Sequence, residues 1–197
     1  MTETTGTTRS QFLARGAKGG LALVAGGAVL GLAEGTAFGA VTADTDIAKL
    51  AATAELLAID FYGHAIASKQ LKGDELAYLA GARENEQAHY AALKGVLKSA
   101  TPKNLKFKYP SSAFASRKSI GMLGEALETA FVGAYMGAVV SLQSNELKAV
   151  AAEIGACESR HLSVLTNIAA GVIVPAPNLP KVLTAAQATA AVSPFLA

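Results

Sequence analysis

The chain of 197 residues is 51% hydrophobic and 6% aromatic, has no tryptophan and carries a formal charge of +2. This length allows one domain with a buried core plus short additions, and the wealth of alanine and leucine favours packed helices over a sheet. So small a charge argues against nucleic-acid binding, which depends on cations that neutralise phosphates. The single cysteine, Cys157, excludes an internal disulfide and a zinc finger. We expect it to be a small buried side chain, with a reactive thiol as the alternative.

Residues 1–43 are predicted to be an export segment. Basic residues precede a short apolar run over residues 19–33, and small residues that suit cleavage after Gly39 or Ala43 follow it. A stretch reading Thr-Arg-Ser-Gln-Phe-Leu resembles a twin-arginine signal, with Ser10 in place of the second arginine. An ordinary secretory signal and an uncleaved membrane anchor are the alternatives. The mature protein is therefore expected in the periplasm or outside a bacterial cell.

The first two helices are predicted to form a hairpin. The first covers residues 45–70, and the second begins with Asp74 as its N-cap and ends before Thr101 and Pro102. The link over residues 71–73 is short, which makes the two helices antiparallel neighbours.

A longer stretch over residues 100–118 separates this hairpin from a second one. Its eighteen or so residues can span about 60 Å when extended, whereas a helix of 26 residues is about 39 Å long. The stretch can therefore cross the bundle from end to end. The third helix is predicted over residues 119–142, and the fourth begins after the cap Ser144 and ends at Gly171. The resulting topology is hairpin, crossover, hairpin.

Residues 172–197 form a tail of a different kind. Three prolines between residues 172 and 180 predict an extended segment. Thr184 and Gln187 form a capping box that predicts a short last helix, which Pro194 ends. We expect the tail to pack on the bundle or on a neighbouring subunit.

Two of the three histidines follow a glutamate by three residues, in Glu86-x-x-His89 and Glu158-x-x-His161. Residues three apart on a helix share a face and lie about 4.5 Å apart along the axis. A carboxylate and an imidazole placed in this way can bind one transition metal ion between them. For either pair taken alone, a solvated surface pair is the alternative interpretation.

The two pairs belong to an internal repeat. In each half of the chain a glutamate is followed by a tyrosine seven residues later and by the Glu-x-x-His pair about 30 residues later. These further members are Glu55 and Tyr62 in the first half and Glu128 and Tyr135 in the second. Because residues seven apart share a helix face, each half is interpreted as a helical hairpin that donates three metal ligands.

Other acidic and histidine residues fit the repeat less well. Glu125 lies one turn before Glu128, but only Glu128 reproduces the spacing to the tyrosine and to the following pair. His64, Asp60 and Glu84 are expected on other helix faces. The two tyrosines of the repeat are candidates to hydrogen-bond the ligands or to carry electrons as radicals, and a buried tyrosine with a satisfied hydroxyl is the ordinary alternative.

Four carboxylates and two imidazoles from four helices are the ligand set of di-iron and di-manganese carboxylate bundles. Carboxylates buried together in an apolar bundle are costly unless cations or protons neutralise them, so two divalent ions are expected. Mixed imidazole and carboxylate ligands suit iron or manganese better than calcium or magnesium, and zinc remains open. The predicted metal ligands are Glu55, Glu86, His89, Glu128, Glu158 and His161.

The chain resembles the ferritin-like superfamily over residues 45–171, and most of all its exported bacterial ferritin-like domain proteins. The blocks that carry the resemblance are residues 54–62, 84–89, 128–135 and 158–161. It implies an all-α fold: a ferritin-like four-helix bundle over residues 44–171, between the export segment 1–43 and the tail 172–197. Bacterioferritin-like relatives often carry an aspartate just before the glutamate of each Glu-x-x-His pair, where it can orient the imidazole. Asn85 and Cys157 stand at those positions here, so the contacts that tune the metals differ.

The resemblance implies a centre of two iron ions that oxidises Fe(II), or reduces oxygen or peroxide, in stress protection: a ferroxidase or peroxidase. Three alternatives stay open: manganese catalase-like disproportionation of peroxide at two manganese ions, a non-catalytic or metal-free stress-associated bundle, and iron storage in a cage. The expected partner is oxygen or peroxide as a small-molecule substrate, with no nucleic acid and no stable membrane span after signal cleavage. A homo-oligomer is an open alternative to a monomer.

Overall fold

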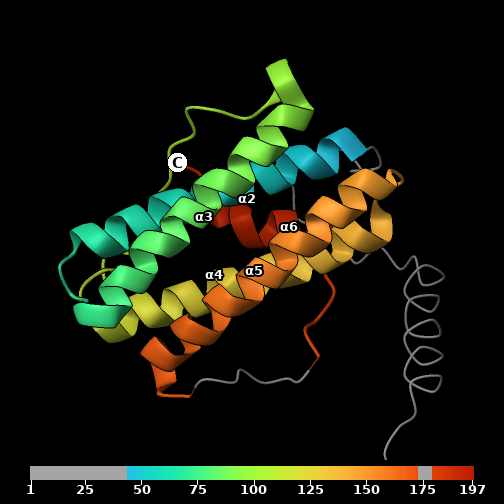
Figure 1. Ribbon diagram of the computed structural model, residues 1–197. Coiled ribbons are helices and arrows are strands. Elements are labelled where there is room, and N and C mark those ends of the chain that lie inside the picture. Colours follow the sequence, from blue (N-terminus) through green and yellow to red (C-terminus); the bar gives the residue numbers. More distant parts are fainter. Residues whose placement is uncertain (1–43, 173–178) are drawn as a thin grey trace, which may run out of the picture. The chain divides into compact units, whose positions relative to one another are not determined.

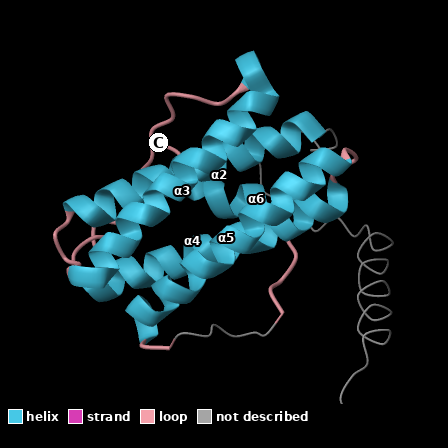
Figure 2. Ribbon diagram, in the orientation of Figure 1, coloured by secondary structure: helices cyan, strands magenta, loops and turns pink. Residues whose placement is uncertain are grey.

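The computed structural model describes residues 44–172 and 179–197, and these residues form four long helices, one short helix and connecting turns (Figures 1 and 2). The long helices are α2 (Asp44–Ala67), α3 (Gly73–Leu97), α4 (Arg117–Ser141) and α5 (Asn145–Ala170). The short helix is α6 (Ala185–Val192), and the 3-10 turns are η1 (Lys98–Ala100) and η2 (Ser193–Phe195). The predicted all-α four-helix bundle with a short C-terminal helix is confirmed. The predicted export segment over residues 1–43 lies outside the described residues.

The long helices are arranged as two hairpins, as the short links predict. Figure 1 shows α2 beside α3 and α4 beside α5, and residues 68–72 and 142–144 join the partners. Contacts between α2 and α4 join the hairpins, whereas α3 and α5 approach each other much less closely than the partners within a hairpin do. Residues 101–116 cross from one hairpin to the other.

Capping residues explain most of the helix ends. The hydroxyl of Ser144 accepts a hydrogen bond from the amide of Leu147, and Gly171 ends α5 in the left-handed conformation, with φ of 76°. The predicted capping box of Thr184 and Gln187 is present at the start of α6. These three ends lie where the sequence places them.

Two predicted helix starts are wrong. α3 begins at Gly73 after Lys72, without a side-chain cap, and Asp74 lies in its first turn, where a carboxylate still interacts favourably with the helix dipole. α4 begins at Arg117, two residues earlier than predicted, because Ser116 and Ser119 form a capping box. This capping box is hard to recognise in the sequence, because its N3 residue is serine and not the usual glutamate or glutamine.

The buried apolar side chains form two clusters along the bundle. One contains Leu57, Phe61 and Leu165, and the other contains Ala52 and Ile154. Along α2 the boundary between the clusters falls near Glu55, so the buried carboxylates form a polar layer between two apolar ones. The fold thus places the predicted ligands at mid-height in the bundle.

The C-terminal segment packs on the bundle, which is one of the two positions expected for the tail. The amide of Leu183 donates to the carbonyl of Gly133 on α4 at 2.9 Å, and α6 contacts both α4 and α2. Beyond α6, Leu196 pairs with Phe107 of the crossover in an isolated antiparallel bridge. Most of the segment predicted to be extended, residues 173–178, lies outside the described residues.

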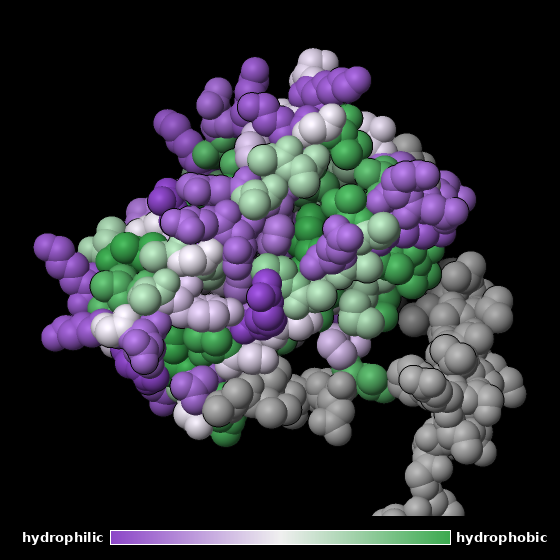
Figure 3. Space-filling view, viewed as in Figure 1, coloured by the Kyte–Doolittle hydropathy of each residue, from purple (hydrophilic) through white to green (hydrophobic). Residues whose placement is uncertain are grey.

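Helix α4 is long and apolar enough to cross a membrane by length and composition, but half of its most apolar window is buried in the bundle. A helix in the core of a bundle meets the same criterion. On the face seen in Figure 3, hydrophilic side chains alternate with exposed apolar ones. The exposed large apolar residues of α4 are Met122, Met136 and Val140.

Candidate metal centre

The structure brings the six predicted ligands together in the polar layer. Each of the four long helices contributes a glutamate, and α3 and α5 each add a histidine. Their ligand atoms form two overlapping groups in which all atoms lie within 4.8 Å of one another. The first group is Glu55, Glu86, His89 and Glu158, and the second is Glu86, Glu128, Glu158 and His161. Glu86 and Glu158 are members of both groups, which is the arrangement expected of two adjacent metal sites.

Both imidazoles turn Nδ1 toward the carboxylates. Nδ1 of His89 lies 3.1 Å from Glu86, 3.2 Å from Glu158 and 3.3 Å from Glu55. Nδ1 of His161 lies 2.8 Å from Glu86 and 3.0 Å from Glu158. One Nδ1 hydrogen cannot serve two or three carboxylates at once, whereas a metal ion accepts the nitrogen lone pair and several oxygens together.

The two tyrosines of the repeat hold the glutamates that belong to only one group. Tyr62 on α2 donates to Oε1 of Glu128 on α4 at 2.6 Å. Tyr135 on α4 donates to Oε1 of Glu55 on α2. Each tyrosine therefore contacts the glutamate of the other hairpin and not the one seven residues before it.

Asn85 and Cys157 both lie beside Nε2 of His161. The side-chain amide of Asn85 crosses from α3 and lies 3.3 Å from Nε2, and the sulfur of Cys157 lies 3.7 Å from it. Metal binding at Nδ1 leaves the ring hydrogen on Nε2, where the amide oxygen of Asn85 can accept it after rotation of the amide. The position just before Glu86 thus contacts a histidine of another helix through a neutral side chain.

The two histidines differ in exposure. The side chain of His161 is 1% exposed and that of His89 is 13% exposed. The ring of Tyr78 meets His161 edge-on, with the ring centroids 6.1 Å apart. The sequence reasoning missed Tyr78. Its place two turns before Asn85 on the same helix face is the signal that could have indicated it.

Every glutamate of the cluster has one buried oxygen that makes no well-formed hydrogen bond, and three of these oxygens only lie 2.8–3.3 Å from an imidazole Nδ1 that other carboxylates also approach. These atoms are Oε2 of Glu55, Oε1 of Glu86, Oε2 of Glu128 and Oε1 of Glu158. An unpaired buried oxygen is costly, and for a carboxylate the cost is greater. Carboxylate oxygens and imidazole nitrogens are donors that divalent transition metal ions bind. Two divalent cations would also balance the charge of four carboxylates.

The pKa values of the clustered carboxyl groups are shifted in different directions. Burial raises the pKa of Glu128 well above its usual value, and repulsion from Glu158 and Glu86 adds to this. Burial raises the pKa of Glu55 in the same way, more strongly than its contact with His89 lowers it. Burial also acts to raise the pKa of Glu86, but hydrogen bonds from His161 and His89 outweigh this effect and lower the pKa to about 2.

The imidazoles are shifted toward their charged forms. Burial acts to lower the pKa of His161, but the carboxylates of Glu158 and Glu86 raise it to about 9. The pKa of His89 is raised as well, against the effect of burial, by Glu158, Glu55 and Glu86. Protons therefore compensate the buried negative charge when no cation does. A metal ion that binds here replaces them.

The acidic and histidine residues that do not fit the repeat lie outside the cluster. Glu125 is partly buried and accepts a hydrogen bond from Thr166 at 3.2 Å. His64 is exposed, lies 3.6 Å from Asp60 and stacks on Phe114. Glu84 is exposed on α3. The acidic residues with the repeat spacing thus cluster, and these others do not.

A groove between α3 and α5 leads toward the His161 side of the cluster. It has a volume of about 540 Å³, and its lining includes Tyr78, Asn85 and Arg160. Arg160 donates to the sulfur of Cys157 at 2.9 Å. Two of these lining residues contact His161, so the groove lies beside that imidazole.

Comparison with known proteins agrees with this geometry. No curated protein matches the chain. The family model described as "Ferritin-like domain" matches residues 43–170, which include all four long helices from Asp44 on and all six clustered residues. The chain therefore belongs to the ferritin-like domain family.

Proposed function

We propose that the protein binds two iron ions, with manganese as the alternative, and oxidises Fe(II) with oxygen or peroxide. The observation that carries the proposal is the convergence of four buried carboxylates, one from each long helix, on two imidazole Nδ1 atoms whose hydrogens are too few to serve them all. A bundle shaped by stability alone would place apolar side chains at these positions, because buried carboxylates without cations are costly.

The residues of the cluster divide into two roles. Glu86 and Glu158 belong to both groups of ligand atoms and would hold both ions, whereas Glu55 and Glu128 would each hold one. Tyr135 and Tyr62 fix the orientation of these last two carboxylates by donating to them. Bound iron would supply one electron per ion.

The overall reaction needs two electrons and two protons. Two Fe(II) ions lose two electrons in all, which reduce one dioxygen with two protons to hydrogen peroxide, or one hydrogen peroxide with two protons to two waters. The chain's own contribution is to fix the carboxylates and imidazoles around the reacting metals and to exclude bulk water, since all but His89 are almost completely buried. The N-terminal segment supports a place for this reaction outside the cytoplasm, in protection against oxidative stress.

The experiment is a metal titration with matched glutamine variants. Protein purified without chelators should contain about two iron or manganese ions per chain, as two ligand groups require. Glu86→Gln removes a ligand common to both groups and should abolish most of the binding. Glu84→Gln, an exposed neighbour on the same helix, should bind as the unchanged protein does. Equal metal content in both variants would contradict the proposal.

The oxidant then distinguishes the reactions. For the oxidase, addition of Fe(II) should consume oxygen, and Glu158→Gln should lose this activity while the exposed Glu153→Gln keeps it. Oxygen release from peroxide by the manganese-loaded protein would instead support the catalase-like alternative. A metal-free protein that loses no stability in Glu86→Gln would support a structural bundle.

A further inference from the structure

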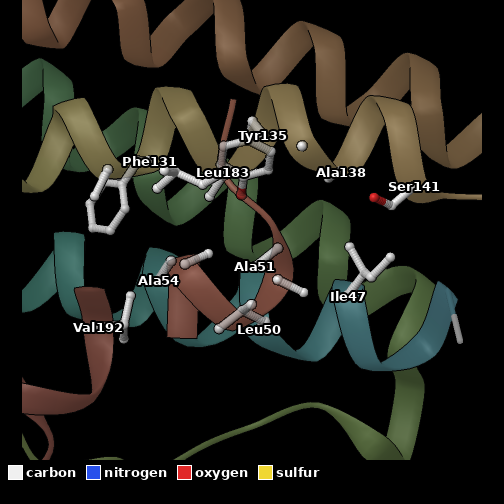
Figure 4. A pocket seen from close by; sticks show the side chains of 15 residues that line it. Ile47, Leu50, Ala51, Ala54, Phe131, Tyr135, Ala138, Ser141, Leu183 and Val192 are labelled. Atoms are coloured by element: carbon white, nitrogen blue, oxygen red, sulfur yellow. The ribbon is translucent and has the colours of Figure 1, made fainter. Parts of the chain in front are cut away.

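A small apolar cavity is lined in part by Tyr135, the tyrosine that donates to Glu55. Its lining comes from α2, α4, α6 and the residues just before α6 (Figure 4). Its volume is about 40 Å³, which exceeds the roughly 10–15 Å³ that one water molecule needs. Among the described residues that line it, only Tyr135 and Ser141 have polar side-chain atoms, and the Tyr135 hydroxyl is already bonded to Glu55.

A second apolar cavity of about 20 Å³ lies next to the first. The two share the lining residues Ile47, Ala51, Tyr135 and Ala138. The outer one is also lined by α6, and the inner one is lined by residues of all four long helices.

The inner cavity ends one helical turn from the first ligand group. Its lining residues Ala51, Leu93 and Ile154 stand four residues from Glu55, His89 and Glu158 respectively. Residues four apart lie above one another on the same helix face. The inner cavity therefore faces the group that contains His89.

Cavities of this kind discriminate by polarity. Apolar cavities stay dry and accept apolar gases such as xenon, whereas a hydroxyl buried without a hydrogen-bond partner is costly. Dioxygen is small and apolar. Hydrogen peroxide has two hydroxyl groups and is better suited to the groove between α3 and α5, whose lining includes the polar side chains of Glu84, Asn85 and Arg160.

We infer that the two cavities lined by Tyr135 bind dioxygen and deliver it to the ligand group of Glu55, Glu86, His89 and Glu158. The inference rests on the proposed function, because it assigns dioxygen as the oxidant that this path admits. The outer cavity needs the C-terminal segment, since Leu183, Ala185, Ala188 and Val192 form part of its wall. The tail is therefore part of the oxygen path.

The test fills the outer cavity without altering a ligand. Ala134→Leu adds three carbon atoms at the cavity wall on α4, and Ala126→Leu places the same side chain on an exposed position of the same helix. Because overpacking can unfold a bundle, Ala188→Leu on α6 serves as a second filling variant, with the exposed Ala186→Leu as its control.

Two measurements are made on each full-length protein. Xenon binding, followed by ¹²⁹Xe NMR on the metal-free protein, should be clear in the unchanged chain and both controls and lost in both filling variants. Stopped-flow oxidation of Fe(II) should show a several-fold higher KM for dioxygen in the filling variants. Their oxidation of Fe(II) by hydrogen peroxide should stay at the level of the controls.

Three results would overturn the inference. They are the absence of xenon from the unchanged protein, an unaltered KM for dioxygen in a filling variant that has lost xenon, and equal slowing with both oxidants. If xenon binds but neither oxidant reacts with Fe(II), the proposed function fails and the oxygen assignment fails with it. If the filling variants still oxidise Fe(II) with peroxide and their KM for dioxygen is unaltered, the oxygen path is refuted but the proposed function is not.

Discussion

Tyr62 donates a hydrogen bond of 2.6 Å to Glu128 in the opposite hairpin, and Tyr135 donates to Glu55 in the reverse direction. The hairpins are thus joined through the carboxylates that would bind metal. The proposed metal binding and the contact between α2 and α4 would therefore depend on the same two hydrogen bonds.

Tyr62→Phe and Tyr135→Phe should weaken metal binding by about 10-fold to 100-fold, the usual effect of losing a partner of a metal ligand. Each variant leaves a carboxylate oxygen without its donor. Tyr90→Phe is the matched control, because its hydroxyl bonds to the carbonyl of Pro102 at 2.7 Å and touches no ligand. All three should lose about 1 kcal/mol of stability, so a metal affinity that falls equally in all three would refute the role of the tyrosines. Isothermal titration with Mn(II) measures the affinity without oxidation.

The metal-free protein should lose stability as the pH rises between about pH 5 and pH 9. The folded-state pKa of His161 is raised from its ordinary 6.5 to about 9, so its contribution is complete below 6.5 and disappears as the pH rises through 9. Glu55 and Glu128 have raised pKa values and act in the same direction from their ordinary value of 4.5 upward. Each such proton changes the free energy of unfolding by up to about 1.4 kcal/mol per pH unit.

Metal should remove this dependence, because bound cations replace the protons. Urea denaturation of metal-free and Mn(II)-loaded protein across this range provides the comparison. Glu86, with its pKa lowered to about 2, acts oppositely and makes the metal-free protein less stable as the pH falls from 4.5 toward 2. A metal-free protein whose stability rises steadily from pH 5 to pH 9 would contradict the prediction.

Asn85→Asp should strengthen metal binding at the His161 side. A carboxylate 3.3 Å from Nε2 would accept the ring hydrogen more strongly than an amide does and make Nδ1 a better ligand. Asn85→Leu removes the acceptor and should weaken binding by about 10-fold or more. Asp and Leu variants with equal affinity would show that Asn85 does not orient the imidazole. Competition with a chelator gives the affinities, and Glu84→Gln serves again as the exposed neighbour.

How much of this site the sequence could predict depends on the range of the interactions. Spacings of three and seven place side chains on one helix face, and the repeat of that pattern was enough to identify the six residues that cluster. The same spacing could not show that Tyr62 reaches Glu128 and not Glu55, because it contains no information on which neighbouring helix a face meets. Asn85 is similar: its position was noted from the resemblance, but its partner, His161, lies on another helix.

Helix ends depend mainly on local capping, yet only some of them could be predicted, since the starts of α3 and α4 lie elsewhere than expected. Ser144, Gly171 and Thr184 act on their own helices and were predicted correctly. The position of the tail was left open between the bundle and a neighbouring subunit, because it depends on two glycines of α4. Only the folded chain brings the backbone near Leu183 against them.

Gly137→Ala should detach the C-terminal segment. A Cβ at Gly137 would overlap the carbonyl oxygen of Leu183, and backbone cannot move aside as a flexible side chain can. Gly95→Ala is the control, since a Cβ there meets nothing within 4 Å and alanine should stabilise α3 by up to about 1 kcal/mol. The two variants should therefore shift thermal stability in opposite directions.

Limited proteolysis should cleave the segment around residues 179–184 faster in Gly137→Ala. The same variant should lose xenon from the outer cavity, because Leu183 and α6 wall it. A Gly137→Ala protein as stable and as protease-resistant as Gly95→Ala would show that the tail does not depend on this close approach.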